Sequence, residues 1–363
     1  MSYRDLCEFP GHDALMALNR RKLARFTPQM LYMSRPTTLL HSLEAFTSRI
    51  DFDRLAHHLS GGAMLNSPSS TAAYLIYRSD WDDEAEAYLR FVILSTLLES
   101  GFSTDQLGQT SIEKLTGFME EILDERDGVC GFAPGILPDA DDTAKSIFSL
   151  NSAGRAVGCD KLIETFNAQK HFKTYDLEVT HSFSVNCNVL KAMLVAGDVI
   201  GHLDHIFTVL RYLCQNWHNG QNLRPQYSMM LLGEAFALFL RRWDQAGYID
   251  VPADLMSEHG IVSVVTQIVT RTLSSQSATD SSWDFSTEVT AYALLTLKKL
   301  SSLPWPEGLG TRINAAINAG TQFLREHESD WDRPSHIWIE KVSYGSGALS
   351  LTYCLAALAA KDV

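Results

Sequence analysis

The sequence lacks several features that would point to a nucleic-acid-binding, secreted or membrane protein. Its six cysteines are scattered, without a Cys-x-x-Cys pair or a Cys/His spacing typical of zinc sites, so we expect reduced thiols in a cytoplasmic protein. Lys and Arg number 30 against 43 Asp and Glu, and no long basic run is present, so we expect no nucleic-acid partner. The first thirty residues carry charge throughout, without the apolar stretch of a secretory signal, and no apolar run is long enough to predict a membrane span.

Helical periodicity is what the sequence has in abundance. Apolar residues recur at intervals of three and four over 203–214 and again over 313–324, which places one apolar stripe on each predicted helix. Only the segment 262–273, rich in Val and Ile, fits a strand as well as a helix. We therefore predict an all-α protein.

Several predicted helices begin with a similar phrase. Ser-Ser-Thr-Ala stands at 69–72, Asp-Asp-Thr-Ala at 141–144 and Glu-Val-Thr-Ala at 288–291, and further helix starts follow at 182–188 and 345–348. Recurring helix starts are typical of helical hairpin arrays, and closing such an array into an α/α barrel buries every inner helix. The alternative is that these starts resemble one another only because Ser, Asp and Thr are good helix caps.

Three carboxylates stand close together at the predicted start of one of these helices, at Asp139, Asp141 and Asp142. Acidic residues at a helix N-terminus are favourable in themselves, so a simple cap is one interpretation. The other uses crowding: if the three groups are partly desolvated, at least one should keep its proton near neutral pH and could serve as a Brønsted acid. A second Asp-x-Asp-Asp, at 80–83, is followed by two more glutamates and is predicted to be a solvated helix start.

Several stretches together resemble the class II diterpene cyclases of the copalyl diphosphate synthase type, and most of all the fungal members. They lie at 36–44 (Pro-Thr-Thr-Leu-Leu-His-Ser-Leu-Glu), at 66–72, at 139–144 with the Asp-x-Asp-Asp motif and Thr-Ala after it, and in the tail at 288–297 and 337–342. The resemblance covers nearly the whole chain, and its specificity comes from the order and spacing of the set.

The resemblance implies a terpenoid cyclase toroid. Residues 96–363 would form the β-type α/α-barrel domain that carries the Asp-x-Asp-Asp motif, and residues 1–95 would form a partial γ-type helical domain. The implied reaction is protonation of the terminal alkene of geranylgeranyl diphosphate and cyclisation to a copalyl-type bicyclic product, with the diphosphate retained. The family also implies Mg²⁺, although its ligands are not identifiable in this chain.

The resemblance also assigns the catalytic groups. Asp141 would be the general acid, with Asp139 and Asp142 tuning and positioning it. In relatives an asparagine on a neighbouring helix bonds the acid's second oxygen, and either Asn188 or Asn186 matches it.

Further residues are assigned less specific roles. His41 matches a histidine that helps a water take the final proton in plant members, and Lys22 matches a lysine that meets the diphosphate; a core histidine and a solvated helix lysine are the respective alternatives. Aromatic rings could stabilise the cation, with core packing as the alternative for each. They are Phe132, Trp283, Trp338 and Tyr344.

The sequence departs from the family pattern in ways that leave other functions open. Relatives carry an acidic Mg²⁺-binding element before the stretch at 36–44, and a Gly-Gly-Val-Pro segment entering the second domain; both are absent here. No class I signature is present either, because Lys145 stands where Asp-Asp-x-x-Asp requires a carboxylate. One alternative is a truncated, non-catalytic homologue that binds a prenyl diphosphate or a partner, and a more distant one is another α/α-barrel enzyme such as a protein prenyltransferase subunit or a glycosidase.

Overall fold

The chain folds into two compact units. A computed structural model describes residues 17, 20–21, 24–60, 63–64, 67–80, 82, 85, 93–131, 137–175, 178, 181–219, 226–246, 250–335, 337–339, 342–344 and 347–360. The units are Met1–Glu86 and Ala87–Val363, whereas the sequence analysis divided the chain between residues 95 and 96.

In its described residues, the first unit consists of short helices and one small hairpin. Its elements are α2 (Gln29–Tyr32), the 3₁₀ helices η2 (Thr38–Phe46) and η3 (Phe52–His58), the antiparallel pair β1 (Leu59–Ser60) and β2 (Ala63–Met64), and α3 (Pro68–Tyr77). Buried side chains from different elements form its core, among them Leu31, Leu43, Leu55 and Tyr74.

The second unit is helical, and the prediction of an all-α protein is confirmed. Besides the helical stretch at 93–99, its described helices are α5 (Thr104–Leu107), α6 (Gln109–Glu125), α7 (Ala140–Ser152), α8 (Asp160–Phe166), α9 (Phe183–Val195), α10 (Leu203–His218), α11 (Gln226–Ala246), η4 (Ala253–Met256), α12 (Ile261–Ser274), α13 (Thr287–Ser301), α14 (Glu307–Glu326), η5 (Glu328–Asp330) and α15 (Gly347–Ala359). A hairpin of β3 (Ile337–Ile339) and β4 (Val342–Tyr344) precedes α15. The ambiguous segment at 262–273 lies in α12, where its buried Val and Ile side chains recur at helical intervals.

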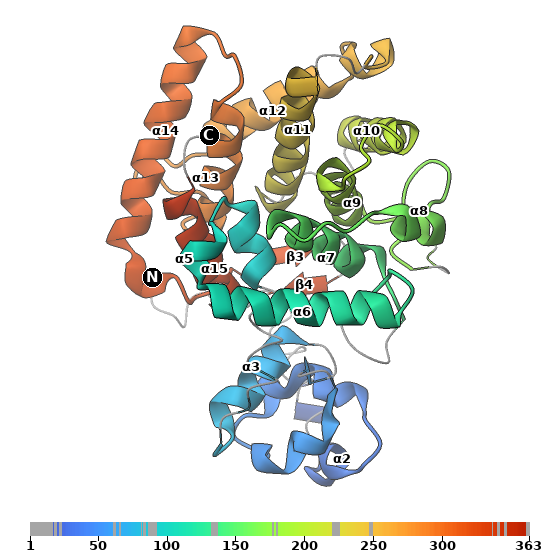
Figure 1. Ribbon diagram of the computed structural model, residues 1–363. Coiled ribbons are helices and arrows are strands. Elements are labelled where there is room, and N and C mark those ends of the chain that lie inside the picture. The colour runs from blue at the N-terminus through green and yellow to red at the C-terminus, as the bar shows by residue number, and fades with distance from the viewer. Residues whose placement is uncertain are drawn as a thin grey trace. The chain divides into compact units, whose positions relative to one another are not determined.

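Alternate helices of this unit form an inner layer (Figure 1). Helix α7 packs against α9, α9 against α11, α11 against α13 and α13 against α15, whereas α10, α12 and α14 pack on the outside of these neighbours. The sequence explains the division, because α9 and α13 are buried almost all round while α14 buries a single apolar stripe. This alternation is the one expected of an α/α barrel.

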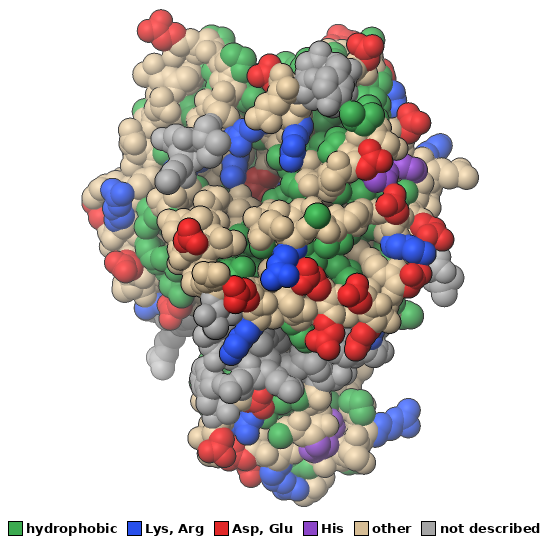
Figure 2. All heavy atoms as spheres, in the orientation of Figure 1, with side chains coloured by type: hydrophobic (Ala, Val, Ile, Leu, Met, Phe, Trp, Pro, Cys, Tyr) green, Lys and Arg blue, Asp and Glu red, His purple; other side chains and the backbone are tan. Residues whose placement is uncertain are grey.

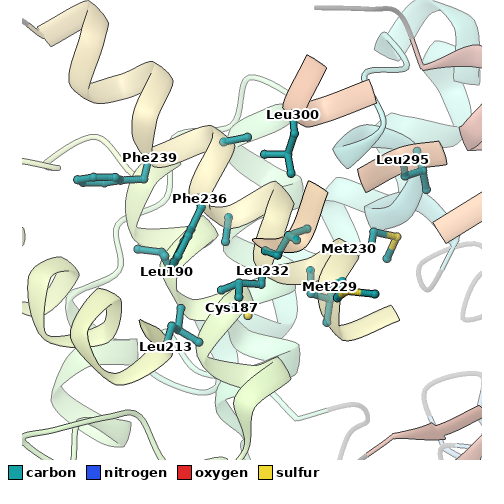
Figure 3. Close-up of a cluster of buried hydrophobic side chains, with 14 of the residues drawn as sticks. Cys187, Leu190, Leu213, Met229, Met230, Leu232, Phe236, Phe239, Leu295 and Leu300 are labelled. Carbon is teal, nitrogen blue, oxygen red and sulfur yellow. The ribbon is translucent and has the colours of Figure 1, made fainter. Parts of the chain in front are cut away.

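The core of the second unit is formed where the inner helices meet. Figure 3 shows Cys187 and Leu190 from α9 beside Leu232 and Phe236 from α11. All four side chains are fully buried. Because apolar contacts of this kind join successive inner helices, each helix of the layer is fixed by its neighbours rather than by its own propensity.

The repeated phrase at the helix starts has a structural cause. A threonine one turn into the helix accepts a hydrogen bond from the backbone of the preceding segment in all three copies. Met64 N donates to Thr71 Oγ1 at 3.0 Å, Cys130 N to Thr143 Oγ1 at 2.9 Å, and Trp283 N to Thr290 Oγ1 at 3.0 Å. The recurrence therefore reflects a shared way of tying a loop to the helix that follows it, in addition to capping.

The surface and the thiols agree with the composition. On the face shown in Figure 2, basic and acidic side chains are interspersed and no extended basic patch is visible. The cysteines of the described residues, Cys130, Cys159, Cys187, Cys214 and Cys354, are buried and free. Within the same residues, no helix combines the length and the apolar character needed to cross a membrane.

Candidate active site

Helix α7 begins at the acidic cluster, and Asp139 is its N-cap. The Asp139 Oδ1 atom accepts a hydrogen bond from Asp142 N at 2.8 Å, which satisfies one of the free amides at the start of the helix. The side chain is only 2 % exposed, and its other oxygen, Oδ2, is buried with no hydrogen-bond partner. A buried carboxyl oxygen without a hydrogen-bond partner lowers stability, so the capping role alone does not explain why this side chain has a second oxygen.

The other two helices that begin with the repeated phrase, α3 and α13, are here called the sister helices, and they show which side-chain atoms an N-cap requires. Helix α3 is capped by Ser67 and helix α13 by Ser286, each through a single hydroxyl oxygen. Both serines stand four residues before the threonine of the repeated phrase, as Asp139 does before Thr143. Because serine satisfies the same position elsewhere in this chain, the second oxygen of Asp139 is a feature that capping does not explain.

Asp141 is held by donors on both of its oxygens. Lys145 Nζ donates to Oδ2 at 2.7 Å from one turn further along α7, and Asn188 Nδ2 donates to Oδ1 at 2.8 Å from α9. The side chains of Asp141 and Lys145 are 27 % and 30 % exposed, whereas Asn188 is buried. Asp141 is therefore bonded by a buried side chain, Asn188, on one oxygen and by a partly exposed side chain, Lys145, on the other.

The structure distinguishes the two candidate asparagines. Asn186 Nδ2 donates to the carbonyl oxygens of Phe172 and Ser182, and its Oδ1 accepts from Phe172 N at 2.8 Å. Its polar atoms are thus used to hold the segment that precedes α9. Asn188 is the asparagine that contacts Asp141, and the alternative assignment to Asn186 is corrected.

The three carboxyl groups have very different proton affinities. Burial, reinforced by the neighbouring charge of Asp142, raises the pKa of Asp139 to about 10, and burial also raises the pKa of Asp142. Burial would raise the pKa of Asp141 as well, but the charge and hydrogen bond of Lys145 and the bond from Asn188 outweigh it, so this pKa is lowered. The raised pKa values of Asp139 and Asp142 agree with the expectation that at least one carboxyl keeps its proton, whereas Lys145 stabilises the ionised form of Asp141. The assignment of Asp141 as the general acid stays a prediction.

Sequence analysis missed a buried charge cluster behind this site. Lys191 of α9, 3 % exposed, places its Nζ 3.0 Å from Glu99 Oε2 and 3.5 Å from Glu234 Oε2 of α11. Burial raises the pKa of Glu234 to about 7, and the Lys191 charge also acts on Asp141. The one charged residue of α9, Lys191, was the available signal for this cluster.

Several predicted site residues fall outside what the structure describes. Lys22 and Phe132 lie outside the described residues. The backbones of His41, Trp338 and Tyr344 lie in η2, β3 and β4, but their side chains are outside the described part. Their proposed roles stay predictions.

Trp283 is a core residue. Its side chain is 1 % exposed, and its indole Nε1 donates to Thr272 O at 2.7 Å. The close approach of Gly320 lets the ring pack against α14. A ring enclosed in this way cannot contact a travelling cation, so the proposed substrate contact is corrected in favour of packing.

Two further features are the second Asp-x-Asp-Asp, which belongs to the first unit, and a cavity of the second unit. Asp82 forms an ion pair with Arg78 and accepts a hydrogen bond from the Tyr74 hydroxyl, in the first unit. A cavity of about 550 Å³ is lined by residues of α11, α12 and the segment after α13. None of its lining residues belongs to α7 or α9.

The Mg²⁺ that the resemblance implies stays a prediction, without ligands identified among the described residues. Among them, no group of three or more His, Cys, Asp or Glu side chains is arranged to hold a metal ion. The Asp139 cluster has one carboxyl capping a helix and another paired with Lys145, which leaves few free oxygens for a divalent cation.

Comparison with known proteins places this arrangement in context. No family model matches the chain. The chain is 36 % identical over 399 residues to pimaradiene synthase pbcA of Emericella nidulans, 38 % over 392 residues to phyllocladan-16-alpha-ol synthase of Phomopsis amygdali and 35 % over 389 residues to copalyl diphosphate synthase of Talaromyces verruculosus. The matches cover 97 %, 97 % and 96 % of the chain.

The chain is a homologue of the fungal diterpene cyclases. It spans about 40 % of the length of these relatives: 40 %, 39 % and 40 %. The fold agrees, because ent-copalyl diphosphate synthase from Streptomyces platensis superposes with a TM-score of 0.59 at 22 % identity, covering 96 % of the chain and 68 % of that protein. The resemblance predicted from the sequence motifs is thereby confirmed.

Proposed function

We propose that this diterpene cyclase homologue performs acid-initiated, class II cyclisation. The substrate would be geranylgeranyl diphosphate, whose terminal alkene takes a proton from Asp141 and whose chain then closes to a copalyl-type bicyclic cation. Loss of a proton from that cation gives the product, with the diphosphate retained. The observation that carries the proposal is the position of Asp141, oriented by Asn188 at the start of α7 between two carboxyl groups of raised pKa.

The chemistry requires a strong, oriented acid without a competing acceptor. An alkene is a poor base, so the proton donor must be a neutral carboxylic acid whose ionised form is stabilised as the proton leaves. Asn188 supplies that stabilisation, because its amide donates to the oxygen of Asp141 that does not face Lys145. Asp139 keeps a proton beside the acid and so limits the negative charge that accumulates in the cluster.

The direct test is turnover by the purified chain. Incubation with geranylgeranyl diphosphate, with and without Mg²⁺, followed by dephosphorylation and mass spectrometry, should give a bicyclic alcohol. Asp141→Asn should abolish the product, and Asp80→Asn in the other Asp-x-Asp-Asp should not. A product that persists in the Asp141 variant contradicts the assignment of the acid.

A second candidate is a binding protein without turnover. It is favoured by one observation, the ion pair that holds Asp141 in its unreactive ionised form. Geranylgeranyl diphosphate would then raise the melting temperature of the chain without being converted. The two candidates are separated by measuring melting and product in the same samples.

A further inference from the structure

The ion pair between Lys145 and Asp141 is the feature that the proposed chemistry leaves unexplained. The two residues stand four apart on α7, so their side chains share one face of the helix, and the Nζ to Oδ2 distance is 2.7 Å. Both side chains are partly exposed, in contrast to Asn188 on the other oxygen. Both members of the ion pair are thus more accessible than the asparagine that bonds the other oxygen of Asp141.

The hydrogen bonds and charge around Asp141 favour its carboxylate form. An ammonium group has three donors and no acceptor, and the Asn188 Nδ2 atom is also a donor. Each oxygen of Asp141 accepts from one of these donors, and the charge of the ammonium group stabilises the carboxylate more than the neutral acid. The contact with Lys145 thus favours the form of Asp141 that cannot protonate an alkene.

We propose that Lys145 is a positioning residue that holds Asp141 as a carboxylate, and that it thereby sets the pH above which the acid is inactive. The inference rests on the proposed function, in which Asp141 is the acid. Protonation of Asp141 from solvent breaks the ion pair and releases the ammonium group. Lys145 therefore makes Asp141 a stronger acid and at the same time lowers the fraction of enzyme in which Asp141 carries the proton.

Other charged groups face the pair and remain in a Lys145 variant. Asp139 and Asp142 belong to the same helix, Lys191 approaches from α9, and the Tyr353 hydroxyl of α15 acts on the lysine. Lys191 continues to favour the carboxylate form, whereas the two aspartates oppose it. Removal of Lys145 alone should thus raise the pH at which Asp141 loses its proton without making it permanently protonated.

The experiment compares the pH dependence of kcat/KM in the wild type, Lys145→Met and Lys145→Arg. Methionine keeps the length of the side chain without its charge, and arginine keeps the charge. We expect the high-pH limb of Lys145→Met to move up by about one to three pH units, and that of Lys145→Arg to stay in place. An unmoved limb in Lys145→Met, or loss of activity at every pH in both folded variants, overturns the proposal.

A second measurement does not depend on turnover. Titration of ¹³C-labelled aspartate carboxyl groups by NMR, with Asp141→Asn to assign the signal, reads the protonation of Asp141 directly. The Asp141 signal of Lys145→Met should titrate at higher pH than that of the wild type. If it does while the wild type makes no product, the proposed function has failed and the role of Lys145 stands; if the two signals titrate together, the role of Lys145 has failed.

Discussion

Asp139 combines a structural task and a chemical one in a single side chain. One oxygen caps α7 and the other is a buried atom without a partner. Because Ser67 and Ser286 cap the sister helices α3 and α13, a serine should serve here as well. The two tasks can therefore be separated by substitution.

Asp139→Ser and Asp139→Ala should differ in stability but not in activity. The serine variant keeps the cap, so its free energy of unfolding should exceed that of the alanine variant by about 1 kcal/mol, measured by urea denaturation. Both lose the protonated carboxyl group beside Asp141, so both should lose most turnover. Equal stability of the two variants would show that the cap contributes little.

The raised pKa of Asp139 also predicts a pH dependence of folding. The pKa rises from 3.8 to about 10 on folding, so between these values the unfolded chain has lost a proton that the folded chain retains. This group's stabilising contribution is complete below about pH 4 and is lost as the pH rises toward 10. Relative to Asp139→Ser, the wild type should lose at least about 1 kcal/mol of unfolding free energy across that window, measured by denaturation at successive pH values.

The two asparagines of α9 offer a matched pair. Asn188→Ala removes the donor on Asp141 and should lower kcat strongly with a small change in stability. Asn186→Ala leaves the Phe172 amide and carbonyl groups without their partner, so it should lower the melting temperature instead. Circular dichroism melting and product assays on both variants test this, and the reverse pattern would contradict the site.

Sequence reasoning reached this site only in part, and the reason is geometric. The Asp-x-Asp-Asp motif is local, so its place at a helix start could be predicted from residues 139–142 alone. The choice between Asn186 and Asn188 depends on how α9 is rotated against α7, since residues two apart point in different directions on a helix. The Lys145 pair was visible as a spacing of four, but its effect on Asp141 depends on burial that no local pattern reports.

At the scale of elements, periodicity identified the helices because apolar stripes follow directly from which face is buried. Helix α12 is the instructive case, since its Val and Ile content favours a strand while their spacing of three and four favours a helix. The packing partners were less predictable. Helix α14 packs on α13, and it requires a glycine at position 320 because the ring of Trp283 lies there. Trp283 comes from the loop before α13, so the spacing within α14 does not predict this contact.

Two glycines of α14 should respond oppositely to alanine. A Cβ at Gly320 would stand 2.7 Å from Trp283 Cζ3, whereas at Gly310 it would meet no atom within 4 Å. Gly320→Ala should therefore destabilise the chain by about 1–3 kcal/mol, and Gly310→Ala should stabilise it by up to about 1 kcal/mol through helix propensity. Thermal melts of both variants measure the difference, and stabilisation by both would show that α14 does not approach Trp283 this closely.

At the scale of the whole molecule, the second unit holds charge in its interior as well as apolar side chains. Lys191 from α9 contacts Glu99 from the helical stretch at 93–99 and Glu234 from α11, so one buried cation joins three elements. Such clusters do not generally add net stability, but removing one member leaves uncompensated charge in the interior.

Lys191→Met should consequently be among the most damaging single changes, costing about 3–5 kcal/mol of unfolding free energy at pH 8. The matched control is Lys161→Met, because Lys161 also pairs with two carboxylates, those of Asp127 and Glu164, but on the surface, where little change is expected. The penalty for Lys191→Met should shrink on acidification, because Glu234, whose pKa burial raises to about 7, then folds in its neutral form. Urea denaturation of both variants at pH 8 and pH 5 measures these differences. Equal effects of the two substitutions would mean that the interior cation does not hold the inner helices together, and that apolar contacts between α9 and α11 suffice.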